Sequence, residues 1–147
     1  MNTQPMNQND IEPRIRTLRI LWIALLFSLC GFFLMTILQK PREEITPNPT
    51  LSLILLLVGV STTLTSFLIR SRLVDRAVEQ RQAPLVHQAY VMGWAINEAS
   101  ALLGVADFFL TGHSHYYLLF IISGCGLLLQ FPRREPVMNA AFKSPGF

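Results

Sequence analysis

Two long stretches of the chain are apolar and carry no charge. Residues 20–38 and 51–69 contain no Asp, Glu, Lys or Arg, and each stretch is 19 residues long. As an α-helix with a rise of about 1.5 Å per residue, such a stretch spans roughly the 30 Å hydrocarbon core of a bilayer. The pattern predicts two transmembrane helices and excludes an ordinary water-soluble domain.

A third apolar segment, residues 86–110, is long enough to span a bilayer but also contains polar and ionisable side chains. A five-residue polar connection, 111–115, leads to a fourth apolar segment, 116–131, which is followed by Pro132. So short a connection favours an antiparallel hairpin of the third and fourth helices. The sequence therefore predicts an all-α integral membrane protein whose four-helix domain covers residues 20–131.

The two ends of the chain are polar. Residues 1–19 are rich in Asn, Gln and Pro and then in Arg, so we expect a largely disordered cytoplasmic tail that ends at the membrane surface. Residues 132–147 are predicted to form a second cytoplasmic tail.

The basic residues are distributed unevenly between the predicted compartments. Of the 12 Lys and Arg residues, ten fall in the two tails and the central loop, and only Lys40 and Arg42 fall in the first loop. By the positive-inside rule, this predicts that both termini are cytoplasmic. The alternative for the central loop, which holds Arg70, Arg72, Arg76 and Arg81, is a nucleic-acid or anionic-lipid site. The net charge of +3 does not indicate a nucleic-acid partner, because the basic residues lie beside hydrophobic runs, where membrane orientation explains them.

Small and polar residues in the third segment recur at helical spacing. At 100° per residue, five of them point within about 40° of a common direction: Gly93, Asn97, Ser100, Gly104 and Asp107. Small residues let helices approach closely, and Asn and Ser can form hydrogen bonds across the contact, so the stripe predicts a helix-packing face. A hydrated pathway lined by the stripe is the alternative.

Glu98 lies at the midpoint of residues 86–110, well away from that stripe. An ionised carboxylate at such a depth costs about 2.5–3.5 kcal/mol on insertion scales, so the group is expected to be paired, hydrated or protonated. Two hypotheses follow. Glu98 is a proton-binding group, or it is a protonated structural carboxyl hydrogen-bonded to a Ser or Thr of another helix.

Other chemistry has little support in the sequence. His113 and His115 could join Asp107 at a metal ion, but two His separated by one residue form an incomplete site. No phosphate-binding glycine loop, nucleophile elbow or zinc-protease motif occurs. We therefore expect no metal, no cofactor and no enzymatic activity.

Part of the chain resembles a known family. Arg81-Gln82-Ala83-Pro84 and the segment from Gly93 to Val105 are similar to the polar loop and the carboxylate-bearing second helix of rotary ATP synthase c subunits. The resemblance implies that Glu98 would be the proton carrier and that the Arg81 region would be the polar loop. The first two spans offer only Gly31 and Gly59 where a c-subunit first helix has closely repeated glycines.

The whole chain, including residues 127–134, looks like a group of small uncharacterised bacterial four-helix membrane proteins. That resemblance implies a multi-pass protein of the bacterial inner membrane. The expected function is a non-enzymatic packing or accessory component of a membrane assembly, whose partners are the lipid bilayer and either another membrane protein or further copies of the chain. The alternative is a proton-binding component, similar to a c subunit, that uses Glu98.

Overall fold

The computed structural model describes residues 11–39, 48–112 and 114–142, which form five α-helices, one 3-10 turn and no strand. The helices are α1 (Ile11–Leu38), α2 (Pro49–Glu79), α3 (Ala83–Thr111), α4 (Tyr117–Leu129) and α5 (Arg134–Phe142), and the 3-10 turn η2 is Ser114–Tyr116. The all-α prediction is confirmed. Within the described part, α1 and α2 are the two helices long and apolar enough to cross a membrane. The predictions for residues 1–10, 40–47, 113 and 143–147 lie outside the described residues.

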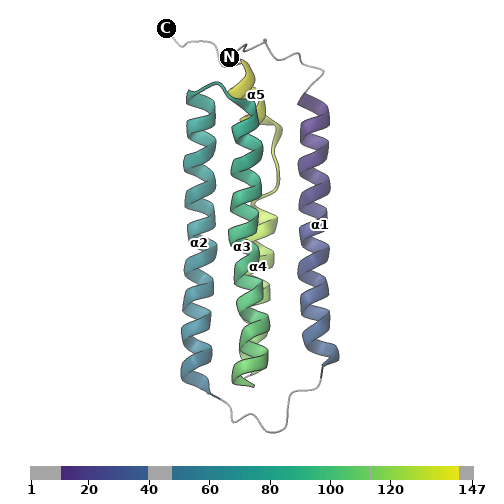
Figure 1. Cartoon of the computed structure of the whole chain (residues 1–147), viewed down its shortest axis with the longest axis vertical. Helices are drawn as coiled ribbons and strands as arrows, with labels where there is room; N and C mark the ends of the chain where they lie inside the picture. The colour runs from purple at the N-terminus through teal and green to yellow at the C-terminus, as the bar shows by residue number, and fades with distance from the viewer. Residues whose placement is uncertain (1–10, 40–47, 113, 143–147) are drawn as a thin grey trace.

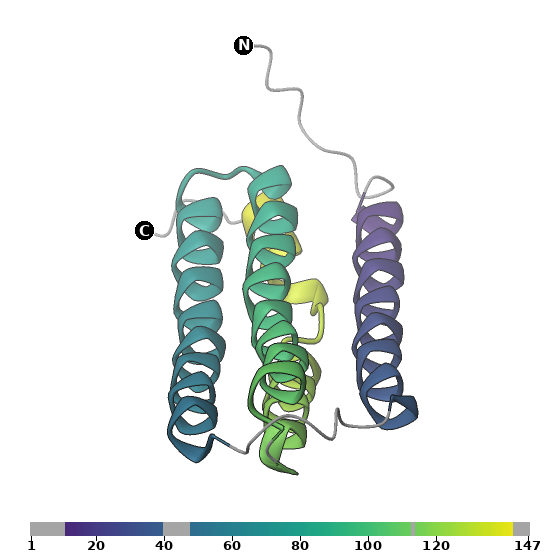
Figure 2. The same cartoon turned by 60° about the horizontal axis from the view of Figure 1, so that its bottom comes forward.

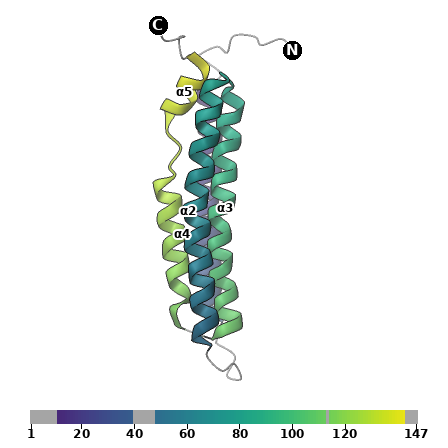
Figure 3. The same cartoon turned by 90° about the vertical axis from the view of Figure 1, so that its left-hand side faces the viewer.

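The four long helices run side by side, with α3 at the centre (Figures 1 and 2). Helix α3 packs against α1, α2 and α4, whereas α1 packs against α3 and α4 but not against α2. Figure 3 shows α2, α3 and α4 as neighbours, with α5 beyond the end of α4. Helices α1 and α2 therefore lie on opposite sides of α3, and each keeps a broad outer face.

Local sequence features set the ends of the central helices. At the start of α2, the Asn48 side chain accepts a hydrogen bond from the Leu51 N–H at 3.1 Å, and Pro49 supplies the helical φ of the first turn. Arg81, with φ 53°, turns the chain tightly from α2 into α3. Helix α3 ends at Gly112, whose φ of 58° is a conformation that glycine adopts without strain. Because these connections are short, α2, α3 and α4 alternate in direction.

Helix α1 begins nine residues before the predicted span, so the predicted disordered tail is wrong for residues 11–19. Ile11, Ile15 and Leu18 recur at helical spacing and are all buried. They belong to the same apolar cluster as Val137 and Ala140 of α5. Helix α5, in the predicted C-terminal tail, therefore supplies the surface against which the first turns of α1 pack.

Helix α4 is shorter than the predicted fourth span. The prediction extended over residues 116–131, but α4 has 13 residues, Tyr117–Leu129, equivalent to about 20 Å. Pro132 lacks an N–H and disfavours helical geometry at Phe131, so the helix ends before it. The chain then runs without helix to Arg134, as Figure 3 shows. The third predicted span, in contrast, lies entirely within α3.

The long sides of the bundle expose large apolar side chains. Phe27 of α1 is 74% exposed, Leu57 of α2 is 59% exposed and Leu110 of α3 is 60% exposed. The basic residues that the structure describes, in contrast, lie toward the end of the bundle where α1 begins, α2 turns into α3 and α5 packs. The nine described ones are Arg14, Arg16, Arg19, Arg70, Arg72, Arg76, Arg81, Arg133 and Arg134.

Candidate functional site

The polar stripe predicted on the third helix is buried along α3. Its five members, Gly93, Asn97, Ser100, Gly104 and Asp107, are all buried. At Gly104, an added Cβ would lie 3.1 Å from Leu119 and from the Phe120 ring of α4. Opposite Ser100, a Cβ on Gly59 of α2 would lie 3.1 Å from the hydroxyl oxygen. One side of α3 therefore meets two helices at close range.

Asn97 joins α3 to α4 by reciprocal hydrogen bonds. Its amide Nδ2 donates to the Ser123 carbonyl at 2.8 Å, and the Ser123 hydroxyl donates to the Asn97 carbonyl at 3.0 Å. Both residues are fully buried. Gly126 lies one turn further along α4, and the Asn97 side chain occupies the space that a Cβ would take there. The amide thus acts as a packing contact between these two helices.

Asp107 is 1% exposed, and its carboxyl group accepts hydrogen bonds at both oxygens. The Ser52 hydroxyl of α2 donates to Oδ2 at 2.9 Å, and the Thr111 hydroxyl donates to Oδ1 at 2.7 Å. His115 and Asp107 line a small cavity of about 160 Å³. His113 lies outside the described residues, and within them no group of three metal-ligating side chains is found. The visible role of Asp107 is to connect α3 with α2.

Glu98 lies on another side of α3, toward α1. The Ser28 hydroxyl of α1 donates a hydrogen bond to its Oε1 at 2.8 Å, and the Glu98 side chain is partly buried. A serine from another helix is the partner that the structural hypothesis required. The structure therefore separates Glu98 from the stripe and places it at the contact between α1 and α3.

Two tryptophans donate hydrogen bonds to carbonyl groups at the end of α4. The Trp22 indole of α1 donates to the Leu127 carbonyl at 2.8 Å, and the Trp94 indole of α3 donates to the Gln130 carbonyl at 3.2 Å. Gln130 is itself fully buried, and its Nε2 donates to the Ser66 hydroxyl at 2.8 Å. Side chains of α1, α2 and α3 thus supply the partners that a broken helix needs away from water.

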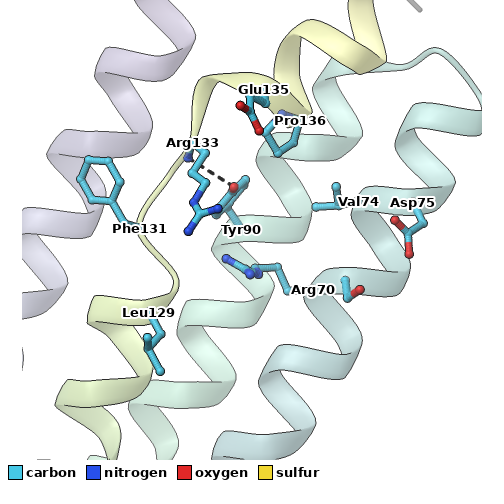
Figure 4. Close-up of a pocket in the computed structure, with 10 residues that line it drawn as sticks. Arg70, Val74, Asp75, Tyr90, Leu129, Phe131, Arg133, Glu135 and Pro136 are labelled. Atoms are coloured by element: carbon cyan, nitrogen blue, oxygen red, sulfur yellow. Dashed lines mark hydrogen bonds between the residues drawn. The ribbon is translucent and has the colours of Figure 1, made fainter.

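A pocket of about 300 Å³ lies beside this break, between α2, α3 and α5 (Figure 4). Figure 4 shows the guanidinium groups of Arg70 and Arg133 directed toward one another near Tyr90. The backbone N–H of Arg133 donates to the Tyr90 hydroxyl at 3.4 Å, and the Arg70 guanidinium lies 5.3 Å from the Tyr90 ring centre. The sequence pattern did not predict this pocket. Two positions in the sequence point to it, because Arg70 is the first charged residue after an apolar span and Arg133 is the first charged residue after the final apolar segment.

No protein-family model, curated protein or solved structure matches this chain. The function is therefore inferred from the side chains described above.

Proposed function

We propose that this chain is a four-span integral membrane protein with both termini on the cytoplasmic side. The observation that carries the proposal is the contrast between the bundle's exposed apolar sides and its one basic end. A water-soluble protein rarely exposes apolar patches larger than a few hundred Å², whereas a bilayer accommodates such sides. The basic end is the one that the positive-inside rule assigns to the cytoplasm.

The fourth span is proposed to combine α4 with the non-helical residues 130–133. The 13 residues of α4 cover about 20 Å, and the three non-helical residues after Gln130 can add at most about 10 Å, which together match a hydrocarbon core of roughly 30 Å. Non-helical backbone at membrane depth is tolerated where protein surrounds it. Gln130 and Pro132 are buried, and two indoles donate to carbonyl groups at this place, so protein covers part of this backbone.

We propose further that the protein is a non-enzymatic accessory or packing component of an assembly in the bacterial inner membrane. The polar side chains of the stripe form contacts within the bundle, as the bonds of Asn97 and Asp107 illustrate. The outer faces of α1 and α2 remain apolar and available to lipid, to another membrane protein or to a second copy of the chain.

Reporter fusions test this topology. A reporter placed after Lys143 is expected to report the cytoplasm, and one inserted in the loop between α1 and α2 is expected to report the opposite side, because the basic end stays inside. Carbonate extraction should leave the full chain in the membrane fraction. A periplasmic C-terminal reporter would refute the proposed orientation, and release by carbonate would refute membrane integration.

The alternative, a proton-binding component similar to a c subunit, depends on Glu98. Its hydrogen bond from Ser28 favours the structural role. Glu98→Gln keeps the size and an acceptor oxygen, so we expect insertion and thermal stability close to those of the wild type. Glu98→Leu, which removes the acceptor, should cost about 0.6 kcal/mol and at most about 1.7 kcal/mol, the average and the maximum for hydrogen bonds between membrane helices. Thermal unfolding in detergent measures both effects.

The same Gln variant separates the two functions. The carrier role predicts that the wild-type chain copurifies with ATP synthase and that the Gln variant assembles but loses proton transport. Both results together would show that Glu98 carries a proton and is not only a structural carboxyl. Unchanged transport in an assembled Gln variant would exclude the carrier role.

A further inference from the structure

We propose that the pocket between α2, α3 and α5 binds a phosphate-ester anion through Arg70 and Arg133, and that the phosphate belongs to the headgroup of an anionic phospholipid. The lipid source rests on the proposed membrane function. The binding chemistry rests on the pocket itself, whose volume of about 300 Å³ lies at the lower end of the range for small-molecule sites.

The two arginines share the pocket without a partner of opposite charge. Within the described residues, the one ion pair is between Arg134 and Glu12, outside this pocket. Asp75 and Glu135 also line the pocket, but neither forms an ion pair with Arg70 or Arg133. In Figure 4 the Asp75 carboxylate lies beyond Val74, away from the two guanidinium groups. Two cations directed toward one another repel, and an anion held between them removes that repulsion.

The Arg70 side chain is held in place, but not all of its hydrogen-bond donors have a partner. Its guanidinium lies 5.9 Å from the Phe67 ring centre and 5.3 Å from the Tyr90 ring centre, so two aromatic faces position it. Its Nε is buried and has no hydrogen-bond partner. The planar guanidinium presents several donors that match phosphate oxygens, and partial removal from water strengthens such charge-assisted bonds.

The position of the pocket favours a lipid source for the phosphate. Arg70 directly follows the uncharged residues 51–69, which places it where the hydrocarbon core ends. Phosphate groups of phospholipids lie at this depth, and basic pockets between membrane helices on the cytoplasmic side bind such headgroups. Exposed Leu129 and Phe131 line the same pocket and provide an apolar surface for the attached acyl chains.

Native mass spectrometry of the full chain in mild detergent tests the site, with phosphatidylglycerol as the anionic probe and phosphatidylcholine as the zwitterionic one. Wild-type protein is expected to retain phosphatidylglycerol, and Arg133→Gln and Arg70→Gln should each weaken its retention about tenfold, because each loses charge-assisted hydrogen bonds. Arg72→Gln is the matched control, since it removes the same charge from an exposed position on α2 outside the pocket. Arg133 is exposed, so its variant keeps the test valid if Arg70→Gln does not fold.

A second measurement distinguishes the two sources of phosphate. Thermal unfolding of the detergent-solubilised chain is followed with sodium phosphate and with sodium chloride at equal ionic strength, since a ligand that binds the folded state raises its Tm. Selective lipid loss in the pocket variants supports the lipid site. A Tm rise with phosphate that disappears in Arg133→Gln, without a lipid difference, retains the phosphate chemistry and assigns it to a soluble ester.

The proposed site would be wrong if Arg72→Gln weakened lipid retention as much as the pocket variants do. It would also be wrong if the pocket variants changed neither lipid retention nor the Tm response to phosphate. These outcomes are independent of the topology test. A chain that stays in the membrane after carbonate treatment but fails both measurements loses only this site, and one released by carbonate loses the membrane function whatever its phosphate response.

Discussion

Gly126→Ala is expected to destabilise the bundle by about 1–3 kcal/mol, the usual cost of adding volume to a well-packed contact. The new Cβ would overlap the Asn97 side-chain oxygen, and it would lie 3.0 Å from Asn97 Cγ and 3.1 Å from the Thr63 methyl group. Asn97 cannot move aside without loss, because its amide nitrogen is bonded to the Ser123 carbonyl. The variant therefore separates α3 from α4 or breaks that hydrogen bond.

Gly124→Ala is the matched control on the same helix. A Cβ there would meet Leu29 at 3.5 Å, an ordinary contact, and alanine is intrinsically favoured over glycine in a helix by about 0.5–1 kcal/mol. Unfolding of both variants in mixed detergent micelles, followed by circular dichroism, gives the comparison. Equal stability of the two variants would show that α3 and α4 do not approach closely at Gly126.

Helix α3 was the element best predicted from the sequence. Its polar residues are spaced at helical intervals, and the structure buries all five stripe residues that share one direction. A span rich in Leu and Ile gives no such information, because lipid-facing and packed positions are equally apolar. Residues 20–38 and 51–69 therefore predicted helices but not their neighbours. The contact between α1 and α3 became visible only through Ser28 and Glu98.

The differences at α1 and α4 have separate causes, which are contact between distant parts of the chain at α1 and the local effect of Pro132 at α4. Residues 11–19 look like a polar tail, yet three apolar side chains among them are buried in a cluster that includes part of α5. At the end of α4, two carbonyl groups accept hydrogen bonds from Trp22 and Trp94, which lie on two other helices. The periodicity of a single segment does not show which distant residues it will contact. The pocket that contains Arg70 and Arg133 could not be predicted for the same reason, because it forms between distant segments.

Trp94→Ala is expected to cost about 3 kcal/mol, at the lower end of the range for large aromatic deletions. Trp94 is fully buried, so alanine leaves a cavity next to Tyr90, whose ring centre lies 5.5 Å from that of Trp94. The lower end applies under the proposed membrane insertion, because lipid is itself apolar and the loss would then come mainly from packing. Unfolding in mixed micelles followed by circular dichroism measures the change.

Trp94→Phe isolates the hydrogen bond at the end of α4. Phenylalanine fills most of the space but has no N–H, so the Gln130 carbonyl loses its indole donor and the expected cost is about 1 kcal/mol. Trp22→Phe is the matched change on the other side of the break, where the Leu127 carbonyl also accepts from the Gln130 N–H and therefore keeps a partner. We accordingly expect Trp22→Phe to cost less than Trp94→Phe. A larger cost for Trp22→Phe would show that the indole of Trp94 is not the more important donor at the end of α4.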